Sequence, residues 1–169
     1  MKKEDIRGVI KHFPGHGSSL DDSHKGFVDI TNTWNEDELI PYKELIKSKN
    51  ANIIMTAHVF NKNLDENYPA TLSYNINTTL LRKKLMFRGL IISDDLQMKA
   101  ISKHYDLNQT LKLAINSGVN ILLFGNHIDN ENIKLETIIN IVYKLILNGE
   151  VKLSSIINSN KLIEKTLNK

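Results

Sequence analysis

The sequence of 169 residues contains no cysteine. Without cysteine the chain can form neither a disulfide bond nor a thiolate metal site, and this absence fits a reducing compartment. A long apolar run is missing as well, because nothing behind the charged N-terminus reaches the length of a signal peptide or a membrane span. We therefore expect a cytoplasmic chain with no membrane partner.

A dominant charge of one sign is also missing. The chain has 22 Lys and Arg against 19 Asp and Glu, mixed along its length, which gives a net charge of +3. Clusters of basic residues interleaved with aromatic residues are absent, so we expect no nucleic-acid partner. With 41% hydrophobic and 24% charged residues, the composition is typical of one globular domain.

Short apolar runs alternate with helical patterns, which indicates βα units and a parallel sheet. Strands are expected at residues 7–11, 52–57, 89–93 and 119–124. Helices are expected at about residues 36–49, 76–87, 107–117, 132–147 and 154–166. The sequence therefore predicts an α/β fold with about four parallel strands that ends in two helices.

Polar side chains follow the expected strands at the points where the strands end. They are Lys11 and His12, then His58, then Asp94 and Asp95, and finally Gly125 and Asn126. In a parallel α/β protein the carboxyl ends of the strands form the edge at which sites are built. We therefore expect a functional site at this edge.

The segment from Ile10 to Gly26 carries most of the ionisable groups at that edge. It holds half of the six histidines, together with two adjacent aspartates. Its proline and glycines supply turns, and a loop of this length usually binds or catalyses. A solvated surface loop with scattered histidines is the alternative interpretation.

Three motifs in this order resemble glycoside hydrolase family 3. The run from Lys11 to Gly17, with Asp22-Ser23-His24, resembles the signature of the family's β-N-acetylglucosaminidases (β-N-acetylhexosaminidases), which are cytoplasmic enzymes of bacterial peptidoglycan recycling. Further along, 55–59 with 69–73 and 89–96 with Met98 resemble the family's next two strand-and-loop motifs. The resemblance covers residues 7–125 and implies a TIM barrel that acts on an N-acetylglucosamine-containing saccharide without a cofactor or metal.

The same resemblance makes the chain only part of a barrel. A TIM barrel takes about 250 residues, and this chain begins just before the fifth strand of the family. We therefore expect the C-terminal half of a TIM (β/α)8 barrel, with residues 1–169 as a partial catalytic domain. Its motif-bearing part is 7–125 and its helical part is 126–169. The Asp and Arg with which the family holds the sugar belong to the missing half.

Half a barrel has physical consequences. The strands near 8–11 and 119–124 would have open edges, and inward-facing residues such as Val9, Ile54, Leu90 or Ile91 would lose their cover. We therefore expect the isolated chain to associate with itself or with a complementary N-terminal half-barrel.

The sequence also departs from the family at Ser18 and Ser19, where Asp and Thr are more frequent, and at Asn120, where Asp is common.

The resemblance assigns roles to individual residues. A retaining glycosidase needs a carboxylate nucleophile and an acid/base group. The nucleophile is Asp94, with Asp95 as the rival that would otherwise cap the next turn. The acid/base is His24, and Asp22 would orient its imidazole and stabilise the charged form. Lys11 and His12 would contact sugar hydroxyls.

Two other readings of the same residues stay open. Imidazole and carboxylate side chains suit zinc or manganese, so His12, His16, Asp22 and His24 could form a metal site. The chain could also be a catalytically inactive half-barrel, or one subunit of a split enzyme.

Overall fold

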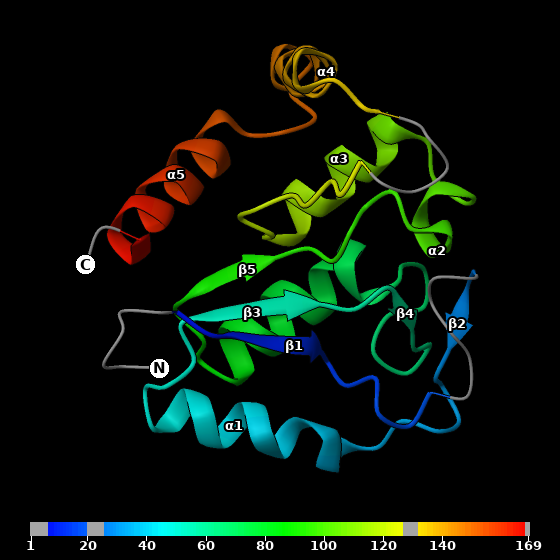
Figure 1. Ribbon diagram of the computed structural model, residues 1–169, viewed down its shortest axis with the longest axis vertical. Helices are drawn as coiled ribbons and strands as arrows, with labels where there is room; N and C mark the ends of the chain where they lie inside the picture. The colour runs from blue at the N-terminus through cyan, green and yellow to red at the C-terminus, as the bar shows by residue number, and fades with distance from the viewer. Residues whose placement is uncertain (1–6, 20–25, 127–131, 168–169) are drawn as a thin grey trace.

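The computed structural model describes residues 7–19, 26–126 and 132–167 (Figure 1). At its centre is a three-stranded parallel sheet in the order β1-β3-β5. The strands are β1 (Val9–Phe13), β3 (Ile53–Thr56) and β5 (Leu90–Ile92). The predicted strands at these three places are confirmed, and their carboxyl ends lie at one edge.

The five predicted helices are present, and two further short elements, at Ala70–Leu72 and Lys99–Ser102, were not predicted. In chain order, the helical elements are the 3-10 turn η2 (Glu36–Leu39), α1 (Ile40–Lys47), the short turn η3 (Ala70–Leu72), the π-type helix η4 (Asn75–Lys84), α2 (Lys99–Ser102), α3 (Leu107–Ser117), α4 (Leu135–Leu147) and α5 (Leu153–Leu167). Local signals fix several ends, because Asn35 and Asp106 accept capping hydrogen bonds at 2.8 Å. Gly118, with φ of 102°, ends α3 in the left-handed region. Figure 1 shows α1 beside β1, α3 beyond β5 and α4 farthest from the sheet.

The fourth predicted strand is only partly formed. Residues 119–124 run beside β5 and form one parallel bridge with it, Ile92 to Ile121. Backbone hydrogen bonds also join the two, from the Asn120 N–H to the Ile91 carbonyl at 2.8 Å and from the Ser93 N–H to the Ile121 carbonyl at 2.9 Å. The Asn120 side chain accepts the hydrogen bond of the Ile91 N–H at 2.9 Å. The Ser93 hydroxyl accepts that of the Leu123 N–H at the same distance. Side chains thus accept the hydrogen bonds of two backbone N–H groups, and the ladder beside β5 is irregular.

A second sheet was not predicted. It consists of β2 (Val28–Asp29) and β4 (Val59–Phe60), which pair in parallel. Two residues are too few to show an alternating pattern, so the sequence gives no signal for such strands.

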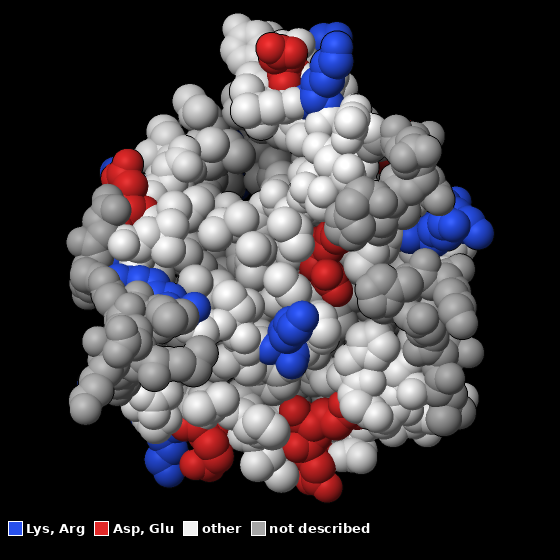
Figure 2. Space-filling model, in the orientation of Figure 1, with Lys and Arg blue, Asp and Glu red and all other residues white. Residues whose placement is uncertain are grey.

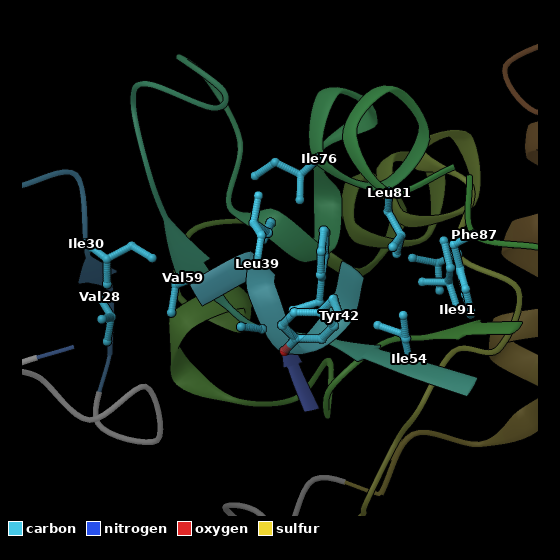
Figure 3. Packing of buried hydrophobic residues seen from close by; sticks show 14 residues of the cluster. Val28, Ile30, Leu39, Tyr42, Ile54, Val59, Ile76, Leu81, Phe87 and Ile91 are labelled. Atoms are coloured by element: carbon cyan, nitrogen blue, oxygen red, sulfur yellow. The ribbon is translucent and has the colours of Figure 1, made fainter. Parts of the chain in front are cut away.

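The main core lies under one face of the central sheet, as Figure 3 shows. Ile54 is aligned with Ile10 and Ile91 and packs there with helix residues such as Leu81. The ring of Phe13 meets Tyr42 edge to face with centroids 5.0 Å apart. Burial raises the pKa of the Tyr42 phenol, which stays neutral in this core.

Less of the strand surface is open than half a barrel suggests. Ile54, Leu90 and Ile91 are fully buried, and of these four apolar residues only Val9, on β1, is exposed, at 41%. This part of the expectation is wrong, because helices cover Ile54 and Ile91 while α5 packs against β5. Of the exposed large apolar side chains in the described residues, four lie on the outer face of α4. They are Leu135, Ile139, Tyr143 and Leu147.

The surface carries mixed charge. Figure 2 shows acidic and basic side chains as separate groups on a mostly uncharged face. Among the described residues, no helix combines the length and the apolar character needed to cross a membrane.

Candidate active site

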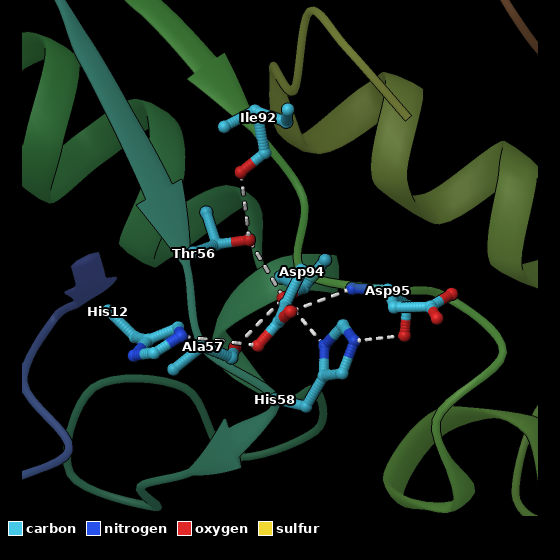
Figure 4. Close-up of polar contacts among 8 residues, drawn as sticks. His12, Thr56, Ala57, His58, Ile92, Asp94 and Asp95 are labelled. Carbon is cyan, nitrogen blue, oxygen red and sulfur yellow. Dashed lines mark hydrogen bonds and ion pairs between the residues drawn. The ribbon is translucent and has the colours of Figure 1, made fainter. Parts of the chain in front are cut away.

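The carboxyl ends of the three central strands bring four predicted edge residues together, as Figure 4 shows. His12 comes from β1, His58 follows β3, and Asp94 and Asp95 follow β5. The His12 Nε2 atom lies 3.6 Å from Asp94 Oδ2, and the two side chains are 29% and 19% exposed. This pair therefore lies at the surface of the site, within reach of a ligand.

Asp94 is held from two sides. Its Oδ1 accepts a hydrogen bond from the Asp95 backbone N–H at 2.9 Å, while its Oδ2 faces His12. Because only Ser93 separates Asp94 from the end of β5, a rigid element sets its position. The arrangement leaves a directed, partly exposed carboxylate.

Asp95 has different surroundings. It is only 6% exposed, and its Oδ1 accepts hydrogen bonds from the N–H groups of Gln97 at 3.0 Å and Gly125 at 3.1 Å. Within the described part of the chain, its Oδ2 has no hydrogen-bond partner. Asp95 therefore caps the turn after β5 and ties it to the end of the 119–124 segment. Of the two aspartates, this geometry favours Asp94 as the one that can meet a substrate.

His58 is buried behind these carboxylates, with 1% of its surface exposed. Its Nδ1 lies 2.8 Å from Thr71 Oγ1, and its Nε2 lies 2.8 Å from the Asp95 carbonyl oxygen. Burial lowers the pKa of His58, and this effect outweighs the nearby carboxylates, so the ring is neutral at pH 7. The sequence put His58 at the site edge without a role, and its partner Thr71 was missed.

The first part of the segment from Ile10 to Gly26 is anchored to the body of the protein. The Trp34 indole N–H donates to the Pro14 carbonyl at 3.1 Å. Glu38 accepts hydrogen bonds from the Gly17 N–H at 3.2 Å and from the Ser18 hydroxyl. At Gly15, where φ is 131°, a Cβ would lie 2.4 Å from Glu38 Oε2. The sequence did not predict either anchor, because hydrogen bonds between residues 20 or 21 positions apart leave no local pattern.

The remaining predicted residues are only partly covered by the structure. Lys11 is exposed on β1 next to His12, where the pairing with β3 shifts register. Asp22 and His24 lie outside the described residues, so the acid/base pair stays a prediction.

The metal hypothesis gains no support from the described part of the chain. No group of three or more His, Asp or Glu side chains there could hold an ion. The rings of His12 and His16 lie 6.0 Å apart at 64°, an edge contact between two rings.

Comparison with known proteins gives a consistent result. Residues 1–165 match the family model described as the glycosyl hydrolase family 3 N-terminal domain. A beta-hexosaminidase A from Pseudoalteromonas piscicida is 34% identical over 139 residues, covering 74% of this chain and 23% of the relative. A beta-hexosaminidase from Tolumonas auensis is 36% identical over 130 residues, covering 75% and 39%.

A solved structure agrees with these relatives. The crystal structure of the beta-N-acetylglucosaminidase from Thermotoga maritima superposes with a TM-score of 0.80 at 32% identity, covering 95% of this chain and 34% of that one. The chain thus spans less than half the length of each of these three proteins. The motifs, the parallel α/β fold and the match over nearly the whole sequence lead to one conclusion: the chain belongs to glycosyl hydrolase family 3.

Proposed function

We propose that this chain supplies the nucleophile-bearing half of a retaining β-N-acetylhexosaminidase that removes terminal β-N-acetylglucosamine from peptidoglycan fragments in the bacterial cytoplasm. The observation that carries the proposal is the contrast between two neighbouring carboxylates. Asp94 is partly exposed and 3.6 Å from His12, whereas Asp95 is buried and caps a turn. The beta-hexosaminidase relatives support the substrate class.

In the proposed reaction, an Asp94 oxygen attacks the anomeric carbon and forms a glycosyl ester as the bond to the leaving oxygen breaks. His24 gives its proton to that oxygen. It then takes a proton from the water that hydrolyses the ester, which restores both groups. Histidine suits this exchange because its ordinary pKa is about 6.5. Asp22 would hold the imidazole in position during both steps.

Sugar binding is proposed for the residues at the end of β1. Lys11 is exposed there and His12 adjoins the nucleophile, so both can donate hydrogen bonds to hydroxyl groups of a bound sugar.

A complementary N-terminal half-barrel is the partner that we propose. The family coverage supports it, because the chain spans 23% and 39% of the two hexosaminidase relatives. The sheet supports it too, because β1 is the outer strand and its Val9 is exposed. A first half-barrel would pair with this edge and bring further groups to the site. Without it, the chain would be an inactive half.

The test is hydrolysis of an aryl β-N-acetylglucosaminide by the chain with and without a supplied N-terminal half-barrel. Activity only in the presence of that half would support a split enzyme. Within an active complex, Asp94→Asn should abolish turnover and His24→Ala should slow both chemical steps. Asp95→Asn should lower the yield of folded protein more than the rate per folded molecule.

Azide gives a sharper assignment of the nucleophile. In Asp94→Gly the small anion can enter the vacated space and attack the anomeric carbon from that side, which yields a glycosyl azide of inverted configuration. Recovery of turnover by azide in Asp94→Gly, and not in Asp95→Gly, would identify Asp94. Wild-type rates in Asp94→Asn would contradict the proposal.

A further inference from the structure

We propose that His58 is a positioning residue for the nucleophile, a neutral imidazole whose Nε2 proton fixes the main chain of Asp95 and thereby the direction of the Asp94 carboxylate. The inference rests on the proposed role of Asp94. It concerns a residue that lies behind the site, where substrate does not reach.

The partners of His58 determine which nitrogen carries the proton. The Asp95 carbonyl, 2.8 Å from Nε2, can only accept, so Nε2 must donate. In a neutral ring Nδ1 then accepts, and its donor is the Thr71 hydroxyl at 2.8 Å. Thr71 in turn accepts from the Thr56 hydroxyl, also at 2.8 Å. The four groups form one chain of hydrogen bonds that all run in the same direction.

A competing arrangement has to be considered, because Thr71 Oγ1 also lies 2.8 Å from the Ala57 carbonyl. If the Thr71 proton pointed there, Nδ1 would have to donate and His58 would be a cation. Ala57 does not need that proton, since its carbonyl already accepts from the Thr71 backbone N–H at 3.1 Å. The neutral arrangement therefore leaves every member of the chain satisfied.

The charges around His58 oppose one another. Asp94 and Asp95 favour the protonated ring, and His12 disfavours it. Burial is the largest effect and also disfavours the protonated ring, because a buried cation loses its hydration. A neutral His58 agrees with the hydrogen-bond geometry.

The link to the nucleophile runs through one residue. The Asp95 carbonyl accepts from His58, and the Asp95 N–H donates to Asp94 Oδ1 at 2.9 Å. Holding the carbonyl fixes the backbone of Asp95 and hence the donor that orients Asp94. A displacement of about 1 Å at a reacting group can cost on the order of 10²-fold in rate, so small movements of this turn matter.

The first experiment measures the tautomer by ¹⁵N NMR of the histidine rings in the full chain. His58→Gln identifies the resonances by their loss, and the exposed His104 provides the spectrum of a solvent-accessible ring. We expect a protonated Nε2 and an unprotonated Nδ1 for His58 at pH 7 and at pH 8. A protonated Nδ1 at pH 7 would overturn the inference.

The second experiment measures the orientation of Asp94 without any sugar. Because the Asp95 amide donates to Asp94, its chemical shift should move as the Asp94 carboxylate titrates. This response should disappear in His58→Leu and be retained in His58→Gln, whose amide can still donate to the Asp95 carbonyl. An unchanged response in His58→Leu would overturn the positioning role.

In an active complex, the same two variants separate positioning from folding. His58→Leu should lower kcat per folded molecule about tenfold or more with little change in KM, and His58→Gln should recover most of the loss. Equal kcat for His58→Leu and wild type would contradict the inference. If the two NMR results hold but no complex hydrolyses the glycoside, the proposed function fails while the geometry of the turn stands.

Discussion

Asp94 and Asp95 have the same side chain and adjacent positions, yet their surroundings give them different chemistry. Asp94 has one oxygen beside His12 near the surface, whereas both oxygens of Asp95 are buried in the turn. The hydrogen bonds of Asp95 come from Gln97 and from Gly125, which lies 30 residues away. A distant segment thus decides which carboxylate is available.

At the same scale, the buried His58 should make stability depend on pH. Its pKa is lowered by burial, from 6.5 in the unfolded chain, so below pH 6.5 the unfolded chain binds a proton that the folded chain does not. Stability is therefore greatest above pH 6.5. It should fall on acidification by at most about 1.4 kcal/mol per pH unit, until the lower pKa of the folded state is reached.

Urea unfolding at pH 7.5 and pH 5, at matched protein concentration, measures this dependence. His58→Gln has no titrating ring, so it should lose less stability than wild type between these two conditions. Identical losses of stability for the two proteins would show that the folded chain binds a proton at His58 as readily as the unfolded chain does.

At the scale of elements, the Asn120 side chain adds to the backbone hydrogen bonds that hold the segment 119–124 beside β5. Asn120 Oδ1 accepts from the Ile91 N–H at 2.9 Å and from Arg82 Nη2 at 2.7 Å, and its Nδ2 donates to the Ser159 hydroxyl at 3.0 Å. It joins β5, η4 and α5 at one point. Burial lowers the pKa of Arg82 to about 10, so its guanidinium needs the acceptors that Asn120 Oδ1 and the Gly89 carbonyl provide.

Removal of the Asn120 side chain should therefore destabilise the fold. Asn120→Ala leaves buried donors without partners, which costs about 1–3 kcal/mol each where water cannot replace the lost bond. Asn120→Asp keeps the acceptor and adds a charge beside Arg82, so its loss should be smaller. Chemical denaturation measures both, with Asn140→Ala on the exposed face of α4 as the control.

If Asn120→Ala and Asn140→Ala were equally stable, the side-chain hydrogen bonds of Asn120 would contribute nothing to the stability of the fold. If Asn120→Asp were less stable than Asn120→Ala, the proposed pairing with Arg82 would be wrong.

At the scale of the whole molecule, the outer face of α4 stands out. Leu135, Ile139, Tyr143 and Leu147 recur every four residues on one side of the helix and are 55–70% exposed. The opposite side of α4 packs against α3 through Leu145 and its neighbours. Exposed apolar surface costs about 25 cal/mol per Å² relative to buried surface, so this stripe favours association.

We therefore predict that the chain expressed by itself is not a stable monomer and self-associates or aggregates. Ile139→Lys with Tyr143→Lys should raise the concentration at which association begins. Asn140→Lys, which adds a charge on a polar exposed position of the same helix, should not. Analytical ultracentrifugation over a range of concentrations measures this difference.

A supplied N-terminal half-barrel should compete with self-association. If the wild-type chain instead sediments as a cooperative, folded monomer at all concentrations, the sheet and α4 need no partner, and the proposed complementary half would lose its physical basis.

Local patterns in the sequence determined much of the architecture. The apolar runs placed β3 and β5 to within one residue at either end, and the helical pattern predicted at 107–117 matches α3. These signals depend on neighbours along the chain, which the sequence displays directly. The motifs likewise identified the family and put Lys11, His12, His58 and Asp94 at one edge.

The tertiary structure alone decided how the polar groups at that edge are paired. The protonated nitrogen of His58 depends on Thr71, and the Ile91 N–H is bound by the side chain of Asn120 in place of a backbone carbonyl. Burial of Asp95 depends on the approach of Gly125. Hydrogen bonding and desolvation act between groups that are close in space, and separation along the chain does not reveal which polar residues meet there.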